Sequence, residues 1–250
     1  MNLIDSTIYS GTSGLVLPVP QSLYPPEFEG KSRLTYYASL FNSVEINSSF
    51  YKIPKVSTVS KWAESVPGNF QFTFKLSKAI THAKGLDFKA EDIDLFMQTI
   101  AYTGNKKGCL LVQFPPRLKI EKFNQLQNLL ISIQSANPNN AWKVVVEFRN
   151  QSWYNEEVYA LLKKYDISMV VHDLPASATP LTVGAASLSY LRFHGPGGRY
   201  RGSYGDDFLY EYAQYIKAWI SEGRAVYFYF NNTMGDAVKN LQTLNSFLQA

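Results

Sequence analysis

Eight short runs of apolar, β-branched and aromatic residues recur along the chain, each bounded by residues that favour turns. They read STIYSG, SVEIN, FQFTFK, CLLVQF, KVVVEFR, ISMVVHD, LSYLRFHG and AVYFYFNN. The runs are almost continuously apolar, which is typical of parallel strands covered on both faces, whereas half-exposed antiparallel strands alternate apolar with polar residues. The pattern therefore predicts eight buried, parallel strands.

Segments with the 3.6-residue period of amphipathic helices lie between most of these strands. They span residues 32–41, 55–65, 90–104, 121–134, 155–166, 206–223 and 234–250. Strands that alternate with helices predict an α/β fold with crossover connections. Because eight similar units fill residues 1–250, we expect one (β/α)8 domain of the TIM-barrel type. The alternative is an open doubly wound sheet, but no GxGxxG, GxxxxGKS or GxxxxGKT turn follows an early strand.

The most irregular segment covers residues 14–28. Its four prolines exclude a regular helix and favour an extended, semi-rigid loop. We expect this loop to lie over one rim of the barrel.

Composition limits the classes of ligand and the cellular setting. The net charge of +4 comes from 24 basic and 20 acidic residues, which permits an anionic ligand but lacks the dense basic stripe of a nucleic-acid binder. The single cysteine, Cys109, excludes an internal disulfide and a zinc site built from several thiolates, and it fits a reducing, cytoplasmic location. No segment approaches the ~20 uninterrupted apolar residues that cross a bilayer, so neither membrane insertion nor export is expected.

Almost every predicted strand ends in a polar or ionisable residue. Because the C-terminal ends of barrel strands converge on one mouth, we predict that these scattered residues form a polar site there. The alternative is that Glu–Arg pairs near the rim only neutralise each other. The catalytic candidates are Glu45, Glu147, Asp173 and His194. The binding candidates are Asn47, Lys75, His82, Gln113, Arg149, Arg192, Arg199, Tyr200, Arg201, Tyr204 and Asn231.

The three histidines lie in different sequence contexts. His194 lies beside a glycine-rich loop, where its imidazole is suited to act as an acid, a base or a metal ligand. His172 and Asp173 are neighbours on one strand and must point to opposite faces, and we expect Asp173 to point inward. His82 follows the strand that ends in Lys75 and is placed to donate to an anionic oxygen.

The loop of residues 195–205 places arginines beside tyrosines. Guanidinium groups next to aromatic faces suit phosphates, bases or sugar rings. The alternative is a solvated loop whose tyrosines pack on neighbouring helices. The side chains concerned are Arg199, Tyr200, Arg201 and Tyr204.

Several motifs together resemble the YecE-like family, also called domain-of-unknown-function family 72. They are GTSG at 11–14, LYPPEF, YYASLFNSVEINSSFY, FTFKLSKAITH, LVQFPP, VVEFRNQSW, HDLP, YLRFHGPGGRYRGSY and YFYFNNTMGDAVKNL, in this order over nearly the whole chain. The resemblance implies a TIM-barrel-like fold and a distant similarity to metal-dependent barrels such as xylose isomerases and endonuclease-IV-like enzymes. It also implies recurrent polar positions at the candidate residues above, except Arg199 and Arg201, and adds Tyr51 and Trp153.

The chain departs from the family pattern directly after GTSG. Leu15 stands where the family usually has a tryptophan, and the tyrosine and tryptophan that follow in the family are also absent. If those aromatic residues line the mouth in relatives, the departure predicts a wider or altered pocket here.

These observations leave three functions open, and the sequence alone does not decide whether the protein is an enzyme. The first is a metal-assisted hydrolase or isomerase acting on a phosphorylated or sugar-like substrate, in which the catalytic candidates bind a divalent metal. The second is metal-free acid–base chemistry on a small anionic compound, with His194 or Glu147 as the proton carrier. The third is a non-enzymatic binding protein for a nucleotide, a nucleic acid or another anionic ligand.

Overall fold

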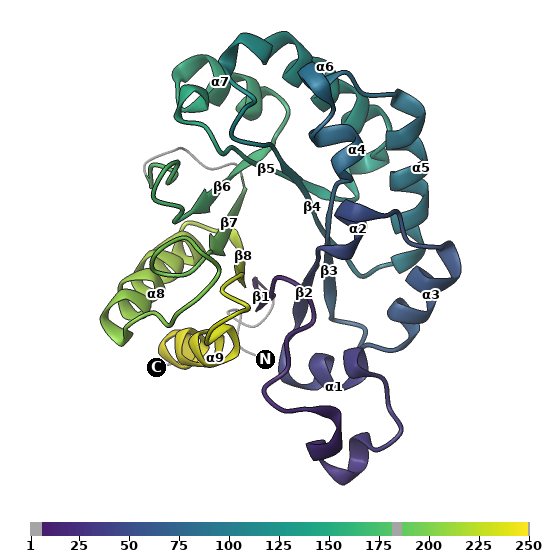
Figure 1. Ribbon diagram of the computed structural model, residues 1–250, viewed down its shortest axis with the longest axis vertical. Helices are drawn as coiled ribbons and strands as arrows, with labels where there is room; N and C mark the ends of the chain where they lie inside the picture. The colour runs from purple at the N-terminus through teal and green to yellow at the C-terminus, as the bar shows by residue number, and fades with distance from the viewer. Residues whose placement is uncertain (1–6, 182–186, 250) are drawn as a thin grey trace.

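A ring of eight parallel strands occupies the centre of the computed structural model, which describes residues 7–181 and 187–249 (Figure 1). The strands pair in the order β1-β8-β7-β6-β5-β4-β3-β2, and each pair is parallel. The predicted (β/α)8 TIM-barrel-like fold is confirmed. The strands are β1 (Ile8–Thr12), β2 (Ser43–Ile46), β3 (Gln71–Lys75), β4 (Lys107–Gln113), β5 (Lys143–Glu147), β6 (Ser168–His172), β7 (Leu188–Phe193) and β8 (Ala225–Phe230).

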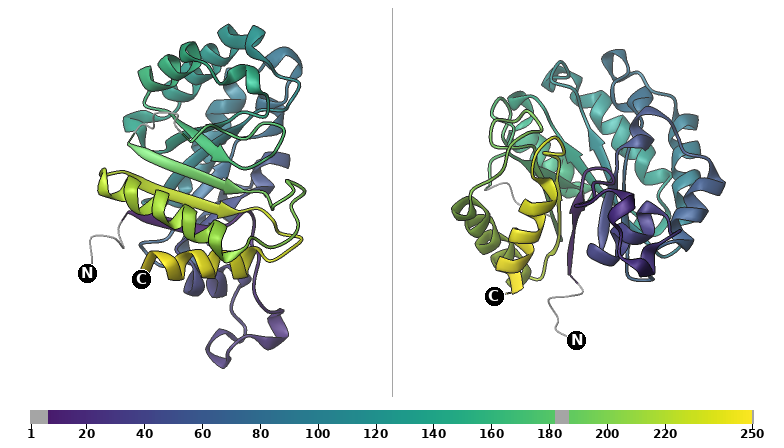
Figure 2. Two further views of the ribbon diagram at one scale, coloured as in Figure 1. Left: turned by 90° about the vertical axis from the view of Figure 1, so that its left-hand side faces the viewer. Right: turned by 60° about the horizontal axis from the view of Figure 1, so that its bottom comes forward.

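Helices surround the strands on the outside of the ring (Figures 1 and 2). They are α1 (Arg33–Leu40), α2 (Ser48–Tyr51), α3 (Val56–Glu64), α4 (Lys78–Thr81), α5 (Ala90–Ile100), α6 (Phe123–Ser135), α7 (Glu156–Lys164), α8 (Asp206–Ser221) and α9 (Ala237–Gln249). Single 3-10 turns are η2 (Gln21–Leu23), η3 (Pro26–Phe28), η4 (Lys84–Leu86), η5 (Ala101–Thr103), η6 (Ile120–Lys122), η7 (Pro138–Asn140) and η8 (Gln151–Trp153). Within the described ranges, no helix combines the length and the apolar character that a membrane span requires.

Local sequence explains where the helices begin and end, and α7 is a clear example. The side chain of Asn155 accepts a hydrogen bond of 3.1 Å from the backbone N–H of Val158, which caps the first turn. Glu156 and Glu157 occupy the first turn and Lys163 and Lys164 the last, where their charges complement the helix dipole.

Two connections depart from a regular barrel. Between β6 and β7, the described residues 173–181 and 187 contain no helix. The proline-rich segment does not cover a rim as expected, because its aromatic side chains pack against α1 and the segment projects away from the barrel (Figure 1). The rings of Tyr24 and Phe28 lie 4.2 and 5.0 Å from the ring of Tyr36 on that helix.

Alternate strand residues belong to two separate apolar clusters. Leu110 and Val112 pack with helix residues in the outer core, whereas Leu111 and Val145 belong to a cluster made of strand residues alone, which is the barrel interior. Tyr190 also belongs to this interior cluster. Following the two-residue period toward the C-terminal ends, the interior changes from apolar and tyrosine side chains to charged ones.

Side chains close the ring where β1 meets β2. Only one backbone bridge, Ser13 with Glu45, pairs these strands in the described residues. The hydroxyl of Tyr37 lies between them, accepting from the backbone N–H of Thr12 at 2.7 Å and donating to the carbonyl of Ser43 at 3.1 Å. A Cβ at Gly11 would lie 2.0 Å from that carbonyl oxygen, so the first glycine of GTSG permits the close approach of the two strands.

Candidate active site

A buried ion network occupies the C-terminal end of the barrel interior, where polar strand ends converge and where the glutamates pair with arginines, as the alternative interpretation of the sequence expects. Arg192, at the end of β7, is only 1% exposed and lies between two fully buried glutamates. Its Nε and Nη2 donate to the two oxygens of Glu45 at 2.9 and 2.6 Å, and its Nη1 donates to Glu147 at 2.6 Å. This bidentate geometry fixes the guanidinium in one orientation.

Glu45 has no oxygen position left for a further ligand. Besides Arg192, it accepts hydrogen bonds from the hydroxyls of Ser13 and Tyr190, each at 2.7 Å. Burial alone would raise the pKa of Glu45, but Arg192 and these hydroxyls outweigh burial and lower it. Glu45 is therefore an ionised anchor for Arg192.

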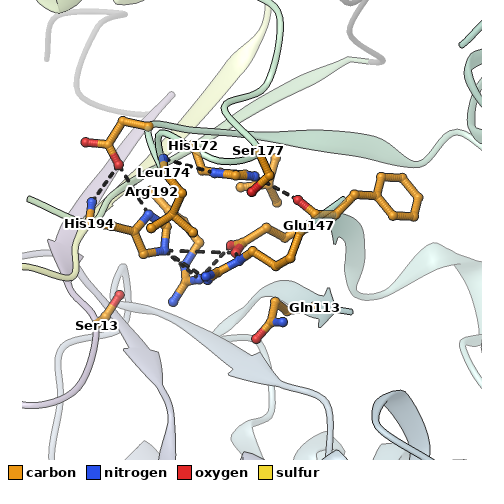
Figure 3. Close-up of polar contacts among 12 residues, drawn as sticks. Ser13, Gln113, Glu147, His172, Leu174, Ser177, Arg192 and His194 are labelled. Carbon is orange, nitrogen blue, oxygen red and sulfur yellow. Dashed lines mark hydrogen bonds and ion pairs between the residues drawn. The ribbon is translucent and has the colours of Figure 1, made fainter. Parts of the chain in front are cut away.

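A second arginine completes the pairing of Glu147. The Nε of Arg149 donates to the same carboxylate that binds Arg192. Burial opposes ionisation of Glu147, yet the two guanidinium groups hold its pKa well below the usual value. Figure 3 shows Glu147 and Arg192 pointing toward each other with His194 beside them.

His194 is fully buried and neutral. Burial is the main cause that lowers its pKa to about 4, although Asp173 opposes this effect. Its Nδ1 lies 3.3 Å from Asp173 Oδ1, and its Nε2 lies 3.1 Å from Arg149 Nη2. Because a guanidinium can only donate, Nε2 is the acceptor and the ring proton lies on Nδ1.

Asp173 anchors the loop that follows β7. It accepts hydrogen bonds from the backbone N–H of His194 and from the hydroxyl of Tyr204, and that hydroxyl also accepts from the N–H of Gly195 at 2.5 Å. Asp173 contacts His194, but the expectation that it points inward is wrong, because His172 pairs with Arg192 and shares the face of Val170, which belongs to the interior cluster. His172 donates from Nε2 to the carbonyl of Phe148 at 2.8 Å.

A pocket of about 170 Å³ lies at the mouth; we call it the mouth pocket. Seven of the predicted binding residues line it, but none of the four predicted catalytic residues does. Phe50 and Tyr51, which form the last turn of α2 just after β2, complete the wall. Their signal was the NSSFY sequence directly after a strand end. The lining residues are Asn47, Phe50, Tyr51, Lys75, Gln113, Arg149, Arg192, Tyr200 and Asn231.

Lys75, the last residue of β3, differs from the two arginines of the mouth pocket. Its ammonium lies 4.2 Å from the centre of the Phe50 ring, but it makes no hydrogen bond or ion pair within the described part of the chain. Burial is the main cause that lowers the pKa of Lys75 to about 8, and the nearby charge of Arg192 adds to this effect.

Two further lining residues have unusual environments. The Oδ1 of Asn47 is buried and has no hydrogen-bond partner among the described residues. Tyr200 has a left-handed backbone with a φ of 60°, and Arg149 Nη1 donates to its hydroxyl at 3.4 Å. Unpaired buried acceptors and strained non-glycine residues concentrate at ligand sites.

The remaining predicted binding residues lie outside the mouth pocket. Arg199 and Arg201 are exposed on the loop after β7, whereas Tyr204 is buried against Asp173. His82 packs edge-on against Phe50, at 5.0 Å, and lines a neighbouring pocket of about 410 Å³ whose charged residues are Lys84, Arg117 and Lys122.

Comparisons with known proteins identify the family. A family model described as "Protein of unknown function DUF72" matches residues 9–250. The chain belongs to the DUF72 family. Protein YunF of Bacillus subtilis is 28% identical over 250 residues, covering 88% of this chain and 87% of YunF.

Solved DUF72 structures share this fold. One from Enterococcus faecalis V583 has a TM-score of 0.79 and 23% identity, covering 97% of this chain and 96% of that chain. One from Thermotoga maritima MSB8 has a TM-score of 0.70 and 25% identity, covering 98% of this chain and 100% of that chain. Together these matches confirm the resemblance predicted from the motifs.

The segment that departs from the DUF72 pattern lies away from the mouth pocket. Leu15 is partly buried and packs against the outer core, and it is not among the residues that line the pocket. The preceding GTSG sequence has a direct role at the site, because Ser13 donates to Glu45.

The described side chains at this barrel mouth do not form a ligand set for a divalent metal. In residues 7–181 and 187–249, no group of three or more His, Cys, Asp or Glu side chains is arranged to hold one. The carboxylates of Glu45 and Glu147 are bound by arginines and hydroxyls instead. The donor set therefore gives no support to the metal-assisted alternative.

Proposed function

We propose that this protein is an enzyme that binds a small phosphate- or carboxylate-bearing compound in the mouth pocket and moves a proton on it without a metal. The observation that carries the proposal is Lys75, a largely buried cation that lines the pocket without an ion pair beside the guanidinium groups of Arg149 and Arg192. A buried charge without a partner is costly, and an anionic ligand would supply the partner.

The distribution of charge around the mouth pocket supports an anion. The cationic groups of Lys75, Arg149 and Arg192 line the pocket, whereas Glu45 and Glu147 contact the arginines and are not among the lining residues. The carboxylates thus hold the guanidinium groups in place. Guanidinium groups held in this way suit the planar or tetrahedral oxygens of carboxylate and phosphate.

The size of the mouth pocket supports a small ligand. Its volume of about 170 Å³ is below the roughly 300–1,000 Å³ typical of sites for drug-sized molecules. A compound of a few carbon atoms with one anionic group suits this volume better than a whole nucleotide or a nucleic acid. The feature that favours the larger ligands is the pair of exposed arginines Arg199 and Arg201.

The proposal makes Lys75 the proton carrier in place of His194 or Glu147. A general base works best when its pKa is close to the working pH, and the pKa of Lys75 is about 8. Glu147 is ion-paired on both oxygens and His194 is hydrogen-bonded on both nitrogens, and neither lines the mouth pocket. The contacts of Glu147 and His194 are instead suited to holding Arg149 and Arg192 in position.

Anion binding tests the proposal directly. Inorganic phosphate and pyruvate should raise the Tm of the wild-type protein in a dose-dependent way. Lys75→Met should weaken binding at least about tenfold, because a charge-assisted contact contributes about 1.5–3 kcal/mol. Lys61→Met, which removes an exposed lysine of α3, is the matched control and should bind like the wild type. Equal affinity in both variants would refute the role of Lys75.

A further inference from the structure

We propose that Lys75 is also an amine nucleophile, which forms a Schiff base with the carbonyl carbon of a small aldehyde or ketone that carries an anionic group. This inference rests on the proposed function, because an anionic group held by the guanidinium groups of Arg149 and Arg192 would place the carbonyl carbon beside the amine. Positioning of this kind lowers the barrier of an addition step by converting it into a reaction within one complex.

The position of Lys75 suits a nucleophile. It is the last residue of β3, so a strand of the barrel, rather than a loop, holds its backbone. Its ammonium lies over the Phe50 ring, and its backbone carbonyl accepts a hydrogen bond of 2.8 Å from Ser49. Among the described residues that line the mouth pocket, Lys75 alone carries a primary amine.

The surroundings of Lys75 favour the neutral amine, which is the reactive form. Burial removes water from the ammonium, and the charge of Arg192 further disfavours protonation. With a pKa of about 8, roughly a tenth of the amine is neutral at pH 7. An ion pair with a carboxylate would restore the charged form, but Glu45 and Glu147 are paired with arginines.

Neighbouring groups suit the intermediate of this reaction. Asn47 Oδ1 has no hydrogen-bond partner among the described residues, so it can accept from the hydroxyl of a carbinolamine. The Tyr200 hydroxyl accepts from Arg149 and carries a proton of its own. The amide side chains of Gln113 and Asn231 add polar groups to the wall.

The proposed step balances without an oxidant or a reductant. The lone pair of neutral Nζ attacks the carbonyl carbon, and the π electrons of the C=O bond move to oxygen. Transfer of one proton from nitrogen to that oxygen gives a neutral carbinolamine. The hydroxyl is then protonated and leaves as water while the C=N bond forms and nitrogen loses its second proton. One amine and one carbonyl compound thus give one imine and one water.

Trapping with borohydride tests the step. The wild-type protein is incubated with pyruvate or, separately, with dihydroxyacetone phosphate, reduced with sodium borohydride, digested and mapped by mass spectrometry. We expect a reduced adduct on Lys75 that forms at least about tenfold faster than on the exposed Lys61 and that excess inorganic phosphate suppresses. Lys75→Arg, which keeps the charge without the amine nucleophile, should give no adduct at this position, and Lys75→Met is the second variant.

The outcomes separate this inference from the proposed function. Adducts spread evenly over exposed lysines, or no adduct with either probe, would show that Lys75 is not an amine nucleophile. If phosphate still raises the Tm of the wild type in that case, the anion pocket stands and only the covalent step is wrong. If phosphate has no effect on Tm and no adduct forms, both proposals fail.

Discussion

The buried ion network and the mouth pocket adjoin each other, yet they use their polar groups differently. In the network, Glu45 accepts four hydrogen bonds and both nitrogens of His194 have partners. In the pocket, the ammonium of Lys75 and the Oδ1 of Asn47 have no hydrogen-bond partner among the described residues. Arg149 and Arg192 belong to both regions, since carboxylates hold them and they line the pocket.

This difference separates residues that hold the site from residues that meet a ligand. A charged group with every partner in place contributes orientation and has little capacity left for substrate. A group without partners is costly in the free protein, and that cost is relieved when a ligand binds. Ionisable residues at a barrel mouth are therefore better assigned by what remains unpaired than by residue type.

Breaking the network should give the largest effect on stability. Glu147→Gln leaves Arg149 and Arg192 without the charge that pairs them, so we expect the free energy of unfolding at pH 7 to fall by about 3–5 kcal/mol. Urea denaturation measures this change. Glu157→Gln, at an exposed glutamate of α7, is the control and should change stability by less than about 0.5 kcal/mol.

The pH dependence of the same variant adds a second readout. The pKa of Glu147 is lower in the folded protein than its ordinary value of 4.5, so its stabilisation is present above pH 4.5 and is lost as pH falls toward the folded pKa. The difference in the free energy of unfolding between wild type and Glu147→Gln should therefore become smaller in acid. A difference that stays constant from neutral pH to strong acid would contradict the ion-pair assignment.

Removing the unpaired cation of the mouth pocket should act in the opposite direction. Lys75→Met replaces a largely buried ammonium by an apolar side chain, and we expect the free energy of unfolding at pH 7 to rise by about 1–3 kcal/mol. The folded pKa of about 8 lies below the ordinary 10.5, so the unfolded wild type binds more protons between these values and wild-type stability rises with pH there. The advantage of the variant should thus disappear by about pH 10.5.

Urea denaturation of Lys75→Met across this pH range, in buffers without phosphate or carboxylate, measures the effect. Lys61→Met controls for the loss of a positive charge and should show no such pH trend. A destabilised Lys75→Met at pH 7 would mean that the ammonium has a partner in solution, and it would weaken the contrast between network and pocket.

The barrel could be predicted from sequence because its strands and helices follow simple periods. Runs such as CLLVQF and KVVVEFR are buried on both faces, and the segment of residues 206–223 has the period of α8. The convergence of polar strand ends also followed from the fold alone. The path of residues 14–28 could not be predicted in this way, because its direction depends on packing of Tyr24 and Phe28 against Tyr36.

Which candidates face the ligand could not be predicted. Sequence gives each strand end a polar side chain, but not whether Glu147 meets Arg149 and Arg192 or remains open. The pairing with Arg192 joins β5 to β7 and depends on register, and both pairings depend on side-chain rotamers. Phe50 was missed for a related reason, since an aromatic residue in a short helix looks like a core residue until its position beside Lys75 is known.

The smallest effect is expected on the exposed loop. Arg199 and Arg201 are exposed and lie outside the mouth pocket. The double variant Arg199→Ala, Arg201→Ala should therefore change the free energy of unfolding by less than about 0.5 kcal/mol. Affinity for inorganic phosphate, measured by calorimetry at physiological salt, should stay within about twofold of wild type, because exposed charges are screened there. The same titration at low salt serves as a control, since long-range attraction weakens as salt rises. A loss of affinity as large as that of Lys75→Met would extend the binding site over this loop and make the ligand larger than the mouth pocket.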